Sequence, residues 1–127
     1  MSDFNIKKAS EFLRRKQEKK QEENRTRFEA AWRDFNKIVA MIIENYKPVR
    51  IYQWGYLLNE NHFSEISDID IAVQGIDLDE HYFAMIGQAM RLTDFPLDIV
   101  EIEKIEPIHA QHIREKGRLV YERTIDT

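Results

Sequence analysis

The stretch Ser67-Asp68-Ile69-Asp70-Ile71-Ala72-Val73 decides the fold of this 127-residue chain. Its β-branched residues predict a strand, and the side chains of a strand alternate between two faces. Asp68 and Asp70 therefore project together from one face, while Ser67, Ile69, Ile71 and Val73 point to the other. The two Cα atoms lie roughly 7 Å apart, so the carboxylates can converge on one cation or two. A divalent ion would relieve their repulsion, and the pair therefore predicts a metal site.

A third acid, Asp98, interrupts the otherwise apolar run Leu97-Asp98-Ile99-Val100. A buried strand would be expected to stay apolar there, so the charge points to a function. Neighbouring strands lie about 4.8 Å apart, and Asp98 therefore reaches the same metals as Asp68 and Asp70 if the two strands are neighbours. Oxygen ligands and the absence of cysteine favour Mg²⁺ or Mn²⁺ over Zn²⁺. Two such ions about 4 Å apart can clamp the attacking and leaving oxygens of a phosphoryl displacement.

The remaining pattern predicts alternating helices and strands. Apolar residues recur every three to four positions from Phe28 to Tyr46, which is typical of an amphipathic helix that ends before Pro48. The later elements are expected to be strands over 49–56, 66–76, 96–102 and 118–122, a helix from a capping box at Asp77 and Glu80 to about Thr93, a helix from Pro107 to Gly117, and a surface loop over 57–66. This order predicts an α/β (α+β) sandwich in which a small mixed sheet packs against helices.

The hydrophobic content of 43% is enough to form one core, which we expect over residues 28–127. Residues 1–27 form a charged arm with 9 Lys or Arg against 5 Asp or Glu, whereas the remainder holds 10 against 18. No apolar residue follows Leu13 in this arm, so it either stays disordered or extends the first helix into a long N-terminal helix. Its acids dilute the positive field, and nucleic-acid binding through the arm is therefore only our third hypothesis.

The sequence has no stretch of signal-peptide character and no apolar run as long as a membrane span. The lack of cysteine also excludes a disulfide framework and a thiolate zinc site. We therefore expect a cytoplasmic protein that does not associate with a membrane.

Gly55-Tyr56, followed after a spacer by Asp68-Ile69-Asp70, resembles the signature of the polymerase-β-like nucleotidyltransferase superfamily, a glycine-serine pair, a spacer and Asp-x-Asp. Tyr52-Gln53-Trp54-Gly55 and the stretch 67–73 resemble, more closely, the minimal nucleotidyltransferases that are paired with HEPN proteins in toxin–antitoxin systems. The strand 97–100 is similar to the family's third-carboxylate strand, and residues 113–122 are similar to its closing helix and strand. The resemblance covers about residues 28–123 and implies a polymerase-β-like core.

The resemblance implies transfer of a nucleoside monophosphate from a nucleoside triphosphate to a hydroxyl group. Asp68 and Asp70 would then bridge the metals and the triphosphate, and Asp98 would hold the metal that activates the acceptor hydroxyl. Gly55 and Tyr56 would lie at the nucleotide, where a glycine lets backbone amides approach a phosphate closely. The short chain leaves little room for an acceptor domain, so the acceptor would come from a partner, by resemblance a HEPN-type toxin.

Two departures from the family pattern leave an alternative open. Tyr56 stands where the family has serine, and residues 57–67 contain no lysine or arginine but include Glu60 and Glu65. A triphosphate would meet less positive charge than usual. The alternative is a catalytically degenerate binding module, which keeps the fold and acts as an antitoxin by contact alone.

Three histidines invite functional interpretations that we do not favour. His109 and His112 share one helix face at a spacing that can bind metal, but no third ligand lies near them in the sequence. His62 could supply the positive charge that the loop lacks, in place of a lysine or arginine, only when it is protonated. We expect surface or packing roles for all three.

Overall fold

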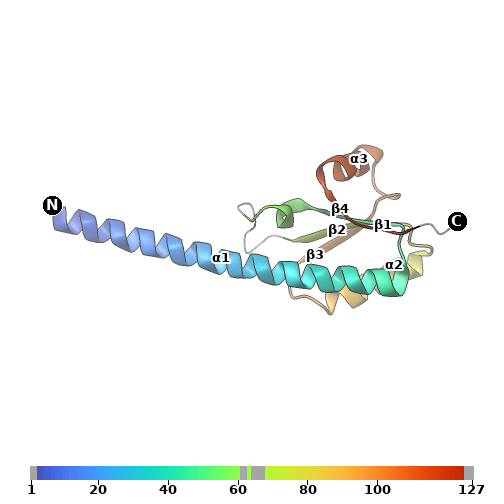
Figure 1. Ribbon diagram of the computed structural model, residues 1–127, viewed down its shortest axis with the longest axis horizontal. Coiled ribbons are helices and arrows are strands. Elements are labelled where there is room, and N and C mark those ends of the chain that lie inside the picture. Colours follow the sequence, from blue (N-terminus) through green and yellow to red (C-terminus); the bar gives the residue numbers. More distant parts are fainter. Residues whose placement is uncertain (1–2, 61–62, 64–67, 125–127) are drawn as a thin grey trace.

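The chain folds in the predicted order of helix, strand, strand, helix, strand, helix, strand (Figure 1). A computed structural model describes residues 3–60, 63 and 68–124. The elements are α1 (Asp3–Tyr46), β1 (Arg50–Trp54), the 3₁₀ helix η1 (Gly55–Leu58), β2 (Ile69–Gln74), α2 (Asp79–Met90), β3 (Leu97–Glu101), α3 (Pro107–Lys116) and β4 (Arg118–Glu122).

The four strands form one mixed sheet in the order β3-β2-β1-β4. Strand β1 pairs antiparallel with β2 and with β4, whereas β2 and β3 are parallel. A parallel pair requires a crossover, and α2 supplies it. The register places Ile69 opposite Leu97 and Asp70 opposite Asp98, so the two strands begin side by side. The predicted α/β class with a small mixed sheet is confirmed.

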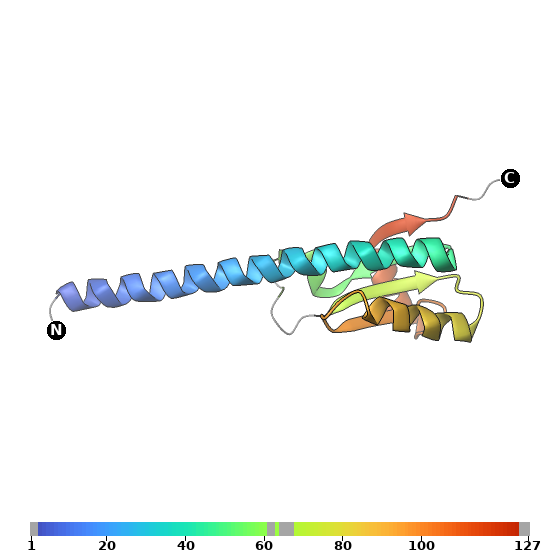
Figure 2. The ribbon, with the colours of Figure 1, turned by 90° about the horizontal axis from the view of Figure 1, so that it is seen from below.

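The helices cover the two faces of the sheet unequally. Helices α1 and α2 lie on one face, and α3 lies on the other (Figures 1 and 2). Within β2, Ile69, Ile71 and Val73 belong to the core beneath α1 and α2, whereas Ala72 belongs to the smaller core beneath α3. Side chains alternate along a strand, so Asp70 projects on the α3 side, away from the main core.

Helix α1 is 44 residues long, which corresponds to about 66 Å. Its C-terminal half packs on the sheet through a buried stripe that consists of Ala31, Phe35, Ile38 and Ile42. The N-terminal half continues as a straight helix beyond the sheet (Figure 2), so the long N-terminal helix is confirmed. No helix in the described ranges is both long and apolar enough to cross a membrane.

Several boundaries differ from the sequence prediction, each for a local reason. The strand expected over 49–56 ends at Trp54, because Gly55 adopts a positive φ of 81° and turns the chain into η1. The capping box at Asp77 was wrong. Helix α2 begins at Asp79, its N-cap is Leu78, and no side chain caps it. The acidic first turn still suits the positive end of the helix dipole.

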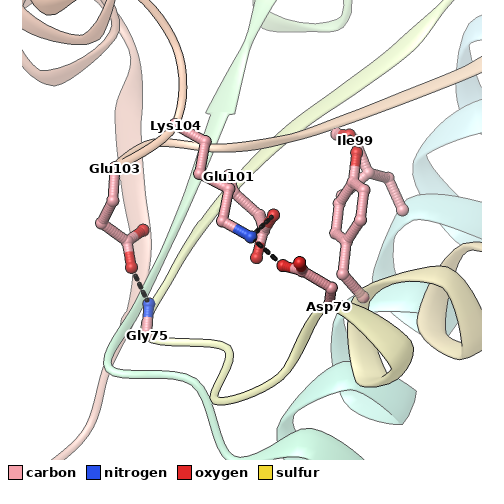
Figure 3. Close-up of polar contacts among 7 residues, drawn as sticks. Gly75, Asp79, Ile99, Glu101, Glu103 and Lys104 are labelled. Atoms are coloured by element: carbon pink, nitrogen blue, oxygen red, sulfur yellow. Dashed lines mark hydrogen bonds and ion pairs between the residues drawn. The ribbon is translucent and has the colours of Figure 1, made fainter.

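A set of polar contacts ties the end of β3 to the loop before α2 (Figure 3). Lys104 forms ion pairs with Asp79 and, at 3.1 Å, with the buried Glu101. The carboxylate of Glu103 accepts a hydrogen bond of 3.0 Å from the amide of Gly75. These contacts fix the β2–α2 loop against the turn that follows β3, at the opposite end of the sheet from Asp70.

Two described residues of the surface loop expected over 57–66 are buried instead of exposed, and residues 61–62 and 64–66 lie outside the described residues. Leu57 and Phe63 are both buried in the main core. The ring of Phe63 packs edge-on against Phe28, with ring centroids 5.6 Å apart. The backbone carbonyl of Phe63 accepts a 2.6 Å hydrogen bond from the side-chain amide of Asn24. Phe63 is therefore held on the long helix by its ring and by its backbone.

We predict that Phe63→Ala lowers the free energy of unfolding by about 3 kcal/mol, because it removes a buried aromatic ring and leaves a cavity. Urea denaturation measures the change. Leu58→Ala is the matched control, since Leu58 is 39% exposed, and should cost less than about 1 kcal/mol. Equal losses in the two variants would contradict the anchoring role of Phe63.

Candidate functional site

The parallel pairing of β2 and β3 brings two of the three predicted carboxylates together. Asp70 is the second residue of β2, and its register partner across the strand pair is Asp98, the second residue of β3. Asp68 precedes β2 by one residue and is half-buried. Asp70 is only 7% exposed, whereas Asp98 is open to solvent on β3, an edge strand of the sheet. The site is thus buried at Asp70 and accessible from the β3 side.

Burial and neighbouring negative charges raise the pKa of Asp70. Burial, followed by the charges of Asp98 and then Asp68, raises the pKa of the Asp70 carboxyl from 3.8 to about 7. Desolvation and neighbouring like charges both disfavour the ionised form. The charges of Asp98 and Asp68 therefore both reach the carboxyl of Asp70. Perturbed carboxyls of this kind are characteristic of functional sites, although ion-pair networks can also produce them.

Gly55 lies directly against this site. Its φ is +81°, and a Cβ built on it would overlap the carboxylate of Asp70. The preceding residue, Trp54, is the register partner of Asp70 in the antiparallel pair of β1 and β2. Glycine is therefore required here both by its conformation and by the close approach of the carboxylate. Tyr56 follows within η1, and its side chain lies outside the described part of the structure.

The donor set suits a hard divalent cation. Three carboxylates offer only oxygen ligands, and a cation among them would remove the repulsion that raises the pKa of Asp70. In the described ranges, no three His, Asp or Glu side chains already converge as the ligand group of an ion. Mg²⁺ typically takes only one or two protein carboxylates and completes its shell with water and substrate phosphates. The chemistry of the residues thus fits the predicted metal.

An arginine side chain of α1 reaches Glu60, which follows η1, and the sequence pattern did not indicate this contact. Arg25 of α1 forms an ion pair with Glu60, with an Nε to Oε1 distance of 3.1 Å. The two residues are far apart in the sequence, so only the packing of α1 reveals the pair. His62 and Glu65, considered above, lie outside the described residues.

The two histidines of α3 do not join the carboxylates in a ligand group within the described part of the chain. The ring of His109 meets Trp54 edge-on at 5.6 Å. His109 and His112 are exposed and border a hollow of about 650 Å³ together with Lys104 and three other residues. Neither belongs to a metal-ligand group within the described part of the chain. The contact with Trp54 supports a packing role for His109.

Comparison with known proteins gives two kinds of likeness. The family model described as polymerase beta, nucleotidyltransferase matches residues 36–126. A crystal structure of the toxin–antitoxin MntA-HepT is similar at 22% identity and a TM-score of 0.54, over 71% of each chain. A crystal structure of a toxin–antitoxin with AMP-PNP is similar at 23% identity and a TM-score of 0.59, over 70% of this chain and 73% of that one. No curated protein matches the sequence significantly. At these identities the structures share a fold.

The raised pKa of Asp70 predicts how stability depends on pH in the metal-free protein. An unfolded aspartate loses its proton near pH 4, whereas folded Asp70 keeps its proton until about pH 7. The folded state therefore loses stability as the pH rises between these values. Each pKa unit corresponds to about 1.4 kcal/mol, so the ionised carboxylate costs roughly 4 kcal/mol above pH 7.

We expect Asp70→Asn to be more stable than the wild type at pH 8 in EDTA by up to roughly 4 kcal/mol, and about equally stable at pH 4. Thermal and urea unfolding across this range measure the difference. Asp94→Asn is the control, since Asp94 is exposed. Parallel pH profiles for wild type and Asp70→Asn would refute the buried, crowded state of this carboxyl.

Proposed function

Since the chain belongs to the polymerase beta nucleotidyltransferase family, we propose that it transfers a nucleoside monophosphate from a nucleoside triphosphate to a hydroxyl acceptor, with Mg²⁺ or Mn²⁺ as the cofactor. The observation that carries the proposal is the pairing of buried Asp70 with Asp98 across the parallel strands. The close approach of Gly55 to Asp70 is the second support.

The roles of the residues follow from their positions. Asp68 and Asp70, at the closed end of the site, would hold the metal and the triphosphate. Asp98, exposed on the edge strand β3, would face the side from which an acceptor can enter. Bound Mg²⁺ would neutralise the phosphates and lower the pKa of the acceptor hydroxyl. Because Gly55 has no side chain, the carboxylate of Asp70 can lie against its backbone, and the phosphates would lie beside this contact.

Two similar structures support the substrate and the partner in this proposal. One similar fold was crystallised with AMP-PNP, an ATP analogue, which supports a nucleoside triphosphate as the donor. The other was crystallised as the toxin–antitoxin MntA-HepT, which supports a HEPN-like toxin as the protein that carries the acceptor hydroxyl. In this proposal the chain acts as the antitoxin by modifying its partner.

A binding module without transfer is the second candidate. The segment 57–67 has no lysine or arginine, and Arg25, which reaches it, is already paired with Glu60. Tyr56 in place of the family serine would oppose nucleotide binding. Such a protein would act on a toxin by contact alone. Nucleic-acid binding through the arm stays a further prediction.

We predict that the protein, incubated with Mg²⁺ and α-labelled nucleoside triphosphates, transfers label to the product of the neighbouring gene. Asp70→Asn and Asp98→Asn should each reduce transfer by about 100-fold or more, because each removes charge that positions the reacting phosphate. Asp94→Asn serves as the control and should retain transfer.

Calorimetry of nucleotide binding separates the two candidates. Absence of both transfer and Mg²⁺-dependent nucleotide binding would rule out the enzyme and leave the binding module. If Tyr56 is the obstruction, Tyr56→Ser should then restore nucleotide binding.

A further inference from the structure

The N-terminal half of α1 exposes apolar side chains on one of its sides. Residues 5–10 and 12–20 are all exposed, and this half of the helix extends beyond the sheet (Figure 2). Ile6, Phe12 and Leu13 are 55%, 65% and 63% exposed. Together with Ala9 they share one side of the helix, because residues three, four and seven positions apart lie on a common face. We call these four residues the arm strip. A solvated helix gains stability when such a strip is covered.

The outer face of α2 exposes a second apolar strip. Phe83 and Met90 are 69% and 62% exposed, and Gly87 lies between them on the same face. A Cβ built on Gly87 would meet nothing within 4 Å, so no contact in the described chain requires glycine there. Glycine inside a helix lowers its stability relative to alanine, but it lets a second helix approach closely. We call Phe83, Gly87 and Met90 the α2 strip.

The two strips have matching spacing. Each places two large apolar residues seven positions apart, Ile6 and Leu13 on the arm and Phe83 and Met90 on α2. Each also has a small residue between the large ones. Two helices that run parallel to each other would therefore bring large residues together at both ends and the small residues together in the middle.

The charges of the two regions are opposite. Residues 3–20 contain seven Lys or Arg against three Asp or Glu, whereas residues 77–106, which include α2, contain eight acids against Arg91 and Lys104. Two arms would therefore repel each other, and an arm would be attracted to the acidic part of the chain that carries α2. Charge thus favours pairing of the arm strip with an α2 strip over pairing of two arms.

An arm cannot reach the α2 strip of its own chain. Asp34 of α1 accepts a hydrogen bond from Thr93, which follows α2. Ala9 precedes Asp34 by 25 residues, which corresponds to about 37 Å of continuous helix. The α2 strip that receives the arm must therefore belong to a second copy of the chain.

The direction of α2 fits such a second copy. Tyr46 contacts His81 and Gln88 near one end of α2, and Asp34 binds Thr93 near the other, so α2 runs antiparallel to α1. The two helices rise equally per residue, and the α2 strip therefore lies level with about residues 37–44 of α1.

A twofold axis that crosses the long helices near residue 25 satisfies these conditions. Residues 6–13 and 37–44 are equally far from residue 25, so the arm strip of each copy would lie level with the α2 strip of the other. The arm would then run parallel to that α2, as the matching spacing requires. Leu13 and Ala31 of the buried stripe are 18 residues apart, or five full turns, so the arm strip faces the side of α1 on which the sheet and α2 lie.

We propose that the arm strip of one copy packs against the α2 strip of a second copy, and the second arm against the first α2, so that the protein forms a closed, isologous dimer with exchanged arms. The contact is reciprocal, as twofold symmetry demands. The proposal does not depend on nucleotide transfer, and its test requires no nucleotide.

Disulfide cross-linking of the whole chain tests the contact, because the natural sequence has no cysteine. An oxidised mixture of Ala9→Cys and Gly87→Cys proteins should form a mixed disulfide between the two copies. Arg14→Cys mixed with Gly87→Cys is the matched control, since Arg14 is exposed on another side of the arm, and should cross-link at least about tenfold less. The double variant with Cys at 9 and 87 should give closed dimers, whereas a ladder of higher species would contradict the twofold arrangement.

Sedimentation equilibrium measures the dimer without cross-links. Leu13→Glu and Gly87→Gln should each raise the dimer Kd at least about tenfold. Gly87→Gln has room within its own chain and introduces a better helix former, so it separates lost association from lost folding. Ile108→Glu is the control, because Ile108 is 76% exposed on α3 and belongs to neither strip.

A wild-type chain that stays monomeric up to about 100 μM would overturn the proposal, as would equal cross-linking of the two cysteine pairs or equal effects of Leu13→Glu and Ile108→Glu. If the chain alone is monomeric but the product of the neighbouring gene binds and requires Leu13 and Gly87, the strips are a site for that protein and the dimer is wrong.

Discussion

The burial of Asp70 among other carboxylates is the constraint on which the arrangement of this fold depends. Its pKa of about 7, caused by burial, Asp98 and Asp68, shows that the sheet holds negative charge in an unfavourable place. The surrounding core has to be stable enough to maintain it. The main core lies on the opposite face of β2 beneath α1 and α2, so packing and site chemistry occupy different faces of one strand.

The order of the strands leaves the site around Asp70 open on one side. Strand β1 is followed by Gly55, which lies against Asp70, and β3 lies on the other side of β2 with Asp98 in register. Because β3 is the edge strand, the site is closed toward β1 and accessible along β3. The ion pairs of Lys104 hold the C-terminal end of β3, the strand that presents Asp98, against α2.

Most of the fold followed from the sequence, because the apolar period of α1 and the β-branched run of β2 depend on local residues. The start of α2 was mispredicted, since no side chain caps Leu78 and the acids at 79–80 follow it. The anchoring of Phe63 and the pair between Arg25 and Glu60 were missed, because both link residues more than thirty positions apart. The roles of Asp68, Asp70 and Asp98 stay predictions, although the register now explains how two of them meet.

Anomalous diffraction from crystals grown with Mn²⁺ and a non-hydrolysable nucleoside triphosphate tests the metal site most directly. The account predicts a manganese peak at about 2.2 Å from carboxylate oxygens of Asp70 and Asp98, beside Gly55. Bound nucleotide with no manganese at these carboxylates, or a peak at His109 and His112 instead, would contradict it.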